Sequence, residues 1–264
     1  MNSLGYTTWC LPKSCDLAVL PDRMVVHAGI QTLEQMHDLK AWPLFNEQAL
    51  RQCLGCYDRR HTISAIAMNL IETFGLNPGA GNRFRSEIFE WCLYVVDIAV
   101  FLNIPAVYIP SFKKNEMVDA ESVTETAAFF KKLCRAVQQF PVMIASENSL
   151  SAQQQLVLAE QVGEPNFRLL LDIFNPLRWG HLVEEIILLA HCCLLDQVHI
   201  KDGVLPGFDN ALLGRGQGHV ADVIKQIKHA GFCNAFILEN NYSVLSMAGF
   251  NADVEFLQSC LSST

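Results

Sequence analysis

Short apolar runs alternate with longer helical patterns along most of the chain. The runs are rich in β-branched and aromatic residues and are bounded by turn formers, so they predict buried strands. Eight such strands are expected, at residues 4–9, 28–34, 63–69, 106–110, 142–146, 167–171, 197–200 and 235–238. Helices are expected up to about residue 27 and at 46–60, 84–102, 119–139, 149–162, 181–193, 219–230 and 248–261.

This alternation predicts one α/β domain over residues 1–264. Strands that alternate with helices pair in parallel through right-handed crossovers. Eight units in 264 residues match the size of a closed (β/α)8 TIM barrel. An open doubly wound sheet is the alternative, but no G-x-G-x-x-G motif joins the first strand to its helix.

Composition narrows the function classes. The net charge is −8 and no dense basic cluster occurs, so we expect no binding to DNA or RNA. Most of the 10 cysteines lie in apolar segments, as is typical of a reducing cytosol, and Cys53 and Cys56 are expected on one face of a helix. Neither a signal peptide nor a membrane span is indicated. The expected location is therefore cytoplasmic.

Four polar residues end consecutive predicted strands. Glu147, Asp172 and Glu239 lie just beyond the ends of strands five, six and eight, and His199 lies near the end of strand seven. The carboxyl ends of barrel strands form the active-site face, so these side chains should meet on one side of it. Three carboxylates and one imidazole suit a divalent cation such as Mn²⁺, Mg²⁺, Co²⁺ or Zn²⁺, which would also offset their repulsion.

Two glutamates beside a metal ion can carry out proton transfer at a carbon acid. The ion polarises a carbonyl, one carboxylate removes the α-proton, and the other returns it. Return to the opposite face of the same carbon gives epimerisation. Return to the neighbouring carbon gives aldose–ketose isomerisation.

The ordered motifs at these strand ends resemble those of the xylose isomerase-like TIM barrel superfamily of sugar and sugar-phosphate isomerases and epimerases. They are Ser146-Glu147-Asn148, Leu171-Asp172-Ile173-Phe174-Asn175, Val198-His199-Ile200-Lys201-Asp202-Gly203 and Leu213-Gly214-Arg215-Gly216. The resemblance covers nearly the whole chain. It implies that Glu147, Asp172, His199 and Glu239 bind one metal ion, and that Glu147 and Glu239 form the acid/base pair.

Five further residues are candidates for binding substrate. Asn175 stands where many members of the superfamily have histidine, and so resembles the Asp-x-x-Asn of L-ribulose-5-phosphate 3-epimerase-like members. Lys201 could reach a hydroxyl or phosphate, or pair with Asp202 instead. The remaining candidates are Arg215 in the glycine-rich loop, Glu34 after strand two and Asn69 after strand three.

The expected function is that of a metal-dependent sugar or sugar-phosphate isomerase or epimerase working through an enediolate. Within the same superfamily, a lyase like 3-dehydroshikimate dehydratase and a non-catalytic sugar-binding barrel are alternatives. Endonuclease IV is less consistent with this chain, because strands three and four end without histidine and the net charge is negative. The sequence leaves the native metal, the substrate and the oligomeric state open, a homo-oligomer included.

Overall fold

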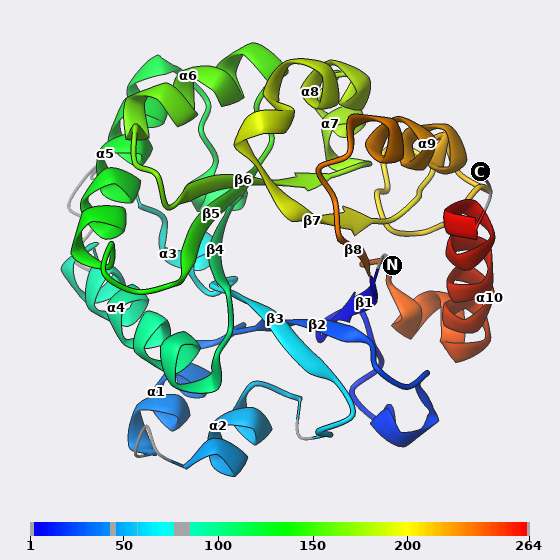
Figure 1. The fold of residues 1–264 in the computed structure, drawn as a ribbon, viewed down its shortest axis with the longest axis horizontal. Coiled ribbons are helices and arrows are strands. Elements are labelled where there is room, and N and C mark those ends of the chain that lie inside the picture. The colour runs from blue at the N-terminus through cyan, green and yellow to red at the C-terminus, as the bar shows by residue number, and fades with distance from the viewer. Residues whose placement is uncertain (1–2, 43–45, 57, 77–84, 263–264) are drawn as a thin grey trace.

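The strands close into a parallel barrel in the computed structural model, which describes residues 3–42, 46–56, 58–76 and 85–262 (Figure 1). Each strand pairs with the next, and β1 pairs with β8 to close the ring. The strands are β1 Ser3–Thr7, β2 Val25–Gly29, β3 Thr62–Ala67, β4 Ala106–Ser111, β5 Met143–Asn148, β6 Phe167–Asp172, β7 Leu194–Ile200 and β8 Ala235–Leu238. The predicted TIM barrel is confirmed.

Helices surround the barrel, as Figure 1 shows. They are α1 Leu33–Ala41, α2 Glu47–Cys53, α3 Ile71–Phe74, α4 Arg85–Leu102, α5 Ala120–Ala136, α6 Ala152–Val162, α7 Asn175–Arg178, α8 Val183–Ala190, α9 Val220–Ala230 and α10 Tyr242–Ser262, with 3-10 turns η1 Leu17–Val19, η2 Lys113–Asn115 and η3 His191–Cys193. Capping residues determine where some of these helices begin and end. Asp119 and Ser151 form capping boxes at α5 and α6, and Gly163 ends α6 in a left-handed conformation.

The two-residue period of the strands separates two cores. In β5, Ile144 belongs to the large outer core between barrel and helices, whereas Ala145 belongs to a small inner cluster. The inner cluster consists of Ala65, Ala67, Ala106, Tyr108, Ala145, Leu170 and Leu195. Because alternate side chains share a face, residue 147 points inward above Ala145. In β6, Asp172 likewise points inward, two residues after Leu170.

The second strand was predicted wrongly. It spans Val25–Gly29 rather than 28–34, and no helix extends to residue 27. Val25 and Val26 favour a strand, and His27 packs into the barrel interior, where it is fully buried. Thr32 then caps α1, which places Glu34 in the first turn of that helix.

Some helix bounds also differ from the predictions. Asn46 caps α2 as expected, but this helix ends at Cys53 rather than at residue 60. Cys56 is buried beyond the helix, so the two cysteines do not share a helical face. The final helix α10 is interrupted at Ser246, where φ is +68°, and its part after this kink agrees with the predicted 248–261. The loop expected at 77–82 lies outside the described residues.

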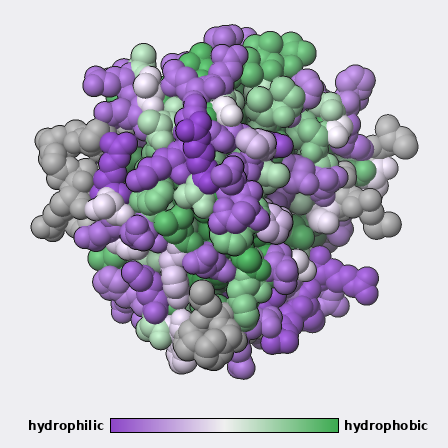
Figure 2. Space-filling view, turned by 60° about the vertical axis from the view of Figure 1, so that its left-hand side comes forward, coloured by the Kyte–Doolittle hydropathy of each residue, from purple (hydrophilic) through white to green (hydrophobic). Residues whose placement is uncertain are grey.

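The surface is largely polar. Figure 2 shows one face on which hydrophilic residues predominate and hydrophobic ones form small patches between them. Among the described residues, no helix combines the length and the apolar character that a membrane span requires.

Candidate active site

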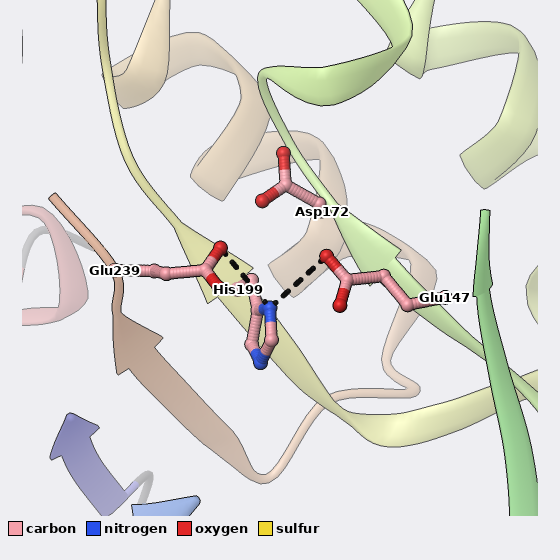
Figure 3. A group of neighbouring side chains, drawn as sticks. All are labelled: Glu147, Asp172, His199 and Glu239. Atoms are coloured by element: carbon pink, nitrogen blue, oxygen red, sulfur yellow. Dashed lines mark hydrogen bonds and ion pairs between the residues drawn. The ribbon is translucent and has the colours of Figure 1, made fainter. Parts of the chain in front are cut away.

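Four side chains converge at the carboxyl ends of β5 to β8. Glu147, Asp172, His199 and Glu239 each offer one ligand atom, and these atoms all lie within 4.8 Å of one another. Figure 3 shows Glu147 and Glu239 on opposite sides of His199, with Asp172 above them. His199 Nδ1 is 3.3 Å from Glu147 Oε1 and 3.3 Å from Glu239 Oε2. The predicted metal ligands are thus neighbours.

Asp172 uses its two oxygens differently. Oδ1 accepts hydrogen bonds from the backbone N–H groups of Phe174, at 2.8 Å, and Asn175, at 2.5 Å, which fix the start of α7. Oδ2 is buried and accepts no hydrogen bond. Lys201 Nζ is 2.9 Å from Oδ2, an ion-pair distance without hydrogen-bond geometry. One oxygen therefore organises the chain, and the other, paired with Lys201, faces the cluster.

A buried relay orients His199. Its Nε2 lies 2.9 Å from His27 Nδ1, and His27 Nε2 lies 2.9 Å from Gln197 Oε1. Gln197 Nε2 donates to the carbonyl of Ser64, at 3.3 Å, which identifies the Gln197 oxygen as the acceptor for His27. His27 must then donate from Nε2 and accept at Nδ1. His199 consequently donates from Nε2, and its Nδ1 faces the carboxylates.

Lys201 lies inside the carboxylate cluster. Its Nζ is 2.8 Å from Glu239 Oε2 as well as 2.9 Å from Asp172 Oδ2, and the side chain is 4% exposed. Pairing with Asp202, one of the two expectations, does not occur. With His199 deprotonated at Nδ1, as a metal ligand must be, three carboxylates and one ammonium would leave a charge that one divalent cation neutralises. Buried charges are costly unless opposite charges pair with them, so a bound cation is expected here.

The environments of the two glutamates push their pKa values apart. Burial raises the pKa of Glu147 to about 7, against the lowering effect of His199. Burial also acts to raise the pKa of Glu239, but the charges of His199 and Lys201 hold it well below its usual range. Burial acts to lower the pKa of His199, yet Glu239 and Glu147 raise it to about 10. The metal-free cluster therefore binds a proton at His199.

Asp202 organises the glycine-rich loop between β7 and α9. Its fully buried carboxylate accepts four backbone N–H bonds of 2.9 Å, which come from Gly203, Gly214, Gly216 and Gly218. A Cβ atom at Gly216 would overlap the Asp202 carboxylate, and Gly214 has φ +75°. The glycines therefore let the loop fold around one buried charge.

A cavity of about 580 Å³ opens above the cluster. It is lined by both glutamates and by three of the five predicted substrate-binding residues, Asn69, Asn175 and Lys201. Asn175 Nδ2 also donates to Glu147 Oε1 at 3.3 Å. Glu34 and Arg215 are exposed and do not line this cavity. The structure thus brings together three of the five.

Sequence reasoning missed other cavity residues. Trp9 donates from Nε1 to Glu239 Oε1 at 3.0 Å, and Arg178 lines the wall at the end of α7. His27 and Tyr108 contact His199 from the barrel interior. Strand parity would have identified His27 had β2 been placed correctly. Arg178 ends a four-residue helix, which is too short to show a periodic pattern in the sequence.

The donor set fits a divalent cation. One ion at about 2.0–2.6 Å from each oxygen or nitrogen requires the ligands to lie within roughly twice that distance of one another, and these atoms lie within 4.8 Å. Asp172 Oδ2 accepts no hydrogen bond and has only the ammonium of Lys201 beside it, which makes it a suitable ligand atom. Mixed carboxylate and imidazole ligands agree with Mn²⁺, Co²⁺ or Zn²⁺ and do not select one of them.

Comparisons with known proteins agree with this geometry. The profile of a family described as xylose isomerase-like TIM barrel matches residues 23–260. A 2-epi-5-epi-valiolone 7-phosphate 2-epimerase from Actinoplanes sp. is 35% identical over 195 residues, which cover 73% of this chain and 70% of that protein.

Solved structures share the fold. A crystal structure of IOLI protein with a binding zinc atom superimposes with a TM-score of 0.76 at 14% identity, over 99% of this chain and 98% of that one. D-Psicose 3-epimerase with D-tagatose from Clostridium cellulolyticum H10 gives 0.72 at 13% identity, over 100% of both chains. At these identities the likeness is one of fold.

Proposed function

Because the chain belongs to the xylose isomerase-like TIM barrel family, we propose that it is a metal-dependent epimerase of a sugar or sugar phosphate. The 35% identity to an epimerase makes it an enzyme of the isomerase class. The name of that relative includes a 7-phosphate and an epimerised carbon. This supports a small polyol-like substrate and favours epimerisation over the lyase and sugar-binding alternatives.

The opposed pair of glutamates carries the proposal. Glu147 and Glu239 approach His199 Nδ1 from opposite sides, each at 3.3 Å (Figure 3). A substrate carbon between them would have one carboxylate on each face. One carboxylate can then remove the proton next to the carbonyl, and the other can deliver a proton to the opposite face. This arrangement inverts the configuration at that carbon.

The surroundings favour different starting roles for the two glutamates. Lys201 at 2.8 Å and the indole N–H of Trp9 at 3.0 Å both favour the ionised form of Glu239. Burial favours the protonated form of Glu147. We therefore assign Glu239 as the base that first removes the proton and Glu147 as the acid that returns one. The opposite substrate epimer would use the pair in reverse.

Asn175 is proposed to hold Glu147 in place and to meet a substrate hydroxyl, and Asn69 and Lys201 to complete the polar lining. Glu147, Asp172, His199 Nδ1 and Glu239 would hold the metal ion. When bound, that ion would supply Lewis acidity, which stabilises negative charge on substrate oxygens. Glu34 and Arg215 are left out of the proposal because they do not line the cavity.

Proton exchange at carbon tests this function directly. We expect the metal-loaded protein to introduce solvent deuterium into the carbon next to the carbonyl of a ketose or ketose phosphate, measured by mass spectrometry over a broad panel. Glu147→Gln and Glu239→Gln should each lower the exchange rate about 10²- to 10⁴-fold, the usual contribution of a general acid or base. Bound metal should be measured in every variant.

Glu34→Gln is the matched control, since it changes an exposed glutamate away from the cavity. It should exchange at the wild-type rate. If metal-loaded wild-type protein exchanges no substrate of the panel, or if full activity persists without metal, the proposed chemistry is wrong.

A further inference from the structure

The guanidinium of Arg178 is held against two aromatic rings at the cavity wall. Its Cζ atom lies 4.5 Å from the ring centre of Phe208 and 5.2 Å from that of Trp179. Both distances are within the range of cation–π attraction. All three residues line the cavity that contains Glu147 and Glu239. Arg178 is thus positioned beside the carboxylate cluster but is not part of it.

The Trp179 platform is itself fixed. Its indole Nε1 donates to Glu116 Oε1 at 2.6 Å, and its ring centre is 5.6 Å from that of Phe112. These contacts tie the end of α7 to the segment after β4. A guanidinium stacked on an immobile ring loses less side-chain entropy when it binds a ligand.

Arg178 forms no ion pair among the residues that the structure describes, although burial raises the pKa of Asp209 and the charge of Arg178 acts to lower it. Of the cavity-lining cations, Lys113 pairs with Glu72 at 2.6 Å and Lys201 lies between Asp172 and Glu239. No ion pair involves Arg178, although Asp209 also lines the cavity. Its N–H groups therefore remain available for an anion.

The ring of Phe208 links this cation to the reacting end of the cavity. Lys201 Nζ lies 5.3 Å from the same ring centre that Arg178 Cζ approaches to 4.5 Å. The two cations can be no farther apart than the sum of these distances, a span that a short sugar chain with a terminal anionic group can bridge. One end of the cavity therefore holds the glutamates that would act on the substrate carbon, and the other end holds Arg178, which could bind an anionic group.

We propose that Arg178 binds the phosphate group of a phosphorylated sugar whose reacting carbon lies between Glu147 and Glu239. The planar fork of arginine matches phosphate oxygens in a bidentate way. Arg178 lines the cavity and is exposed to solvent, which suits a phosphate group that keeps part of its hydration. This inference rests on the proposed function, because it names the substrate class of the same site.

Calorimetric titration of the full chain with glycerol 3-phosphate, glycerol and D-glycerate tests the assignment without turnover. Wild-type protein should bind glycerol 3-phosphate more tightly than the other two. Arg178→Met should weaken that binding about 10- to 100-fold, the value of charge-assisted hydrogen bonds. Arg178→Lys should fall between. Arg215→Met, which removes an exposed arginine outside the cavity, should bind like the wild type.

Repeating the titrations with EDTA separates phosphate bound by arginine from phosphate bound by metal, because the loss caused by Arg178→Met should persist. Equal binding to wild type and Arg178→Met, an equal loss in Arg215→Met, or no binding to wild type would overturn the proposal. Tight D-glycerate binding with the same loss would identify a carboxylate ligand instead. If these binding results are obtained but no deuterium exchange is found, the proposed epimerase function is wrong and the phosphate site at Arg178 still stands.

Discussion

His27 determines which nitrogen His199 offers to the carboxylate cluster. The chain of bonds from Ser64 through Gln197 and His27 leaves a single consistent assignment of protons. In most metalloproteins a carboxylate or carbonyl has this orienting role, and here a second buried histidine has it. His27 contacts the cluster through His199 Nε2, which is not the nitrogen that faces the carboxylates, so it is a positioning residue.

Breaking the relay should weaken metal binding. We expect His27→Phe to lower the affinity for Zn²⁺ or Co²⁺ about 10- to 100-fold, because outer ligand partners typically contribute that much. Titration calorimetry gives the affinity, and nitrogen NMR gives the tautomer of His199.

His27→Gln should bind metal nearly as wild type does. Its side-chain oxygen can accept from His199 Nε2, and its NH₂ group can donate to Gln197. Tyr108→Phe is a second control, since the Tyr108 hydroxyl is 3.3 Å from the same Nε2 and lies outside the relay. Unchanged affinity in His27→Phe would contradict the positioning role.

The four ligands were predictable from the sequence because each is a polar residue at or near the end of a strand that can be recognised from its apolar residues. His27 was not, because its polarity interrupts an apolar run and shifted the predicted strand to 28–34. Glu34 was assigned to the pocket by the same error. Arg215 follows the motif order of the superfamily, but its backbone N–H donates to the carbonyl of Leu212 within the loop, at 2.9 Å, and its side chain is exposed. Arg178 depends on packing between segments distant in sequence.

At the level of elements, the loop between β7 and α9 depends on one buried charge. Backbone N–H groups of four glycines bind Asp202, and Asn240 Oδ1 accepts a bond from its N–H group at 3.0 Å. A glycine-rich sequence alone would predict a flexible segment. The carboxylate instead gives the loop a defined shape beside Lys201.

Asp202→Asn should destabilise the protein by about 2–4 kcal/mol, because an amide cannot accept from all four donors and buried unpaired N–H groups are costly. Urea unfolding followed by circular dichroism measures the change. Asp38→Asn, on the exposed face of α1, should stay within about 0.5 kcal/mol of wild type. Similar midpoints for both variants would contradict the structural role of Asp202.

For the whole molecule, the buried histidine pair makes stability depend on pH. Burial and the charge of His199 lower the pKa of His27 to about 3, below the value near 6.5 of an unfolded histidine. Below pH 6.5 the unfolded chain binds a proton there that the folded chain does not. Stability is therefore lost as the pH falls from about 6.5 towards 3.

His27→Gln removes this titration while it keeps the relay. In metal-free protein, its free energy of unfolding relative to wild type should rise by about 1.4 kcal/mol for each pH unit of acidification between 6.5 and 4.5. Urea unfolding at several pH values measures this difference in the free energy of unfolding. Titration of Glu147 occurs in both proteins, so its contribution cancels. A constant difference for His27→Gln would exclude a neutral buried His27.

The two oxygens of the Asp172 carboxylate have different partners, and this has a thermodynamic consequence. One oxygen faces the cation position and the other fixes the first turn of α7, whose last residue is Arg178. A cation that restrains Asp172 would restrain the helix that presents the guanidinium. By linkage, any factor by which metal improves phosphate binding must equally improve metal binding when phosphate is present. A phosphorylated substrate would then raise the occupancy of the ion on which its own conversion depends.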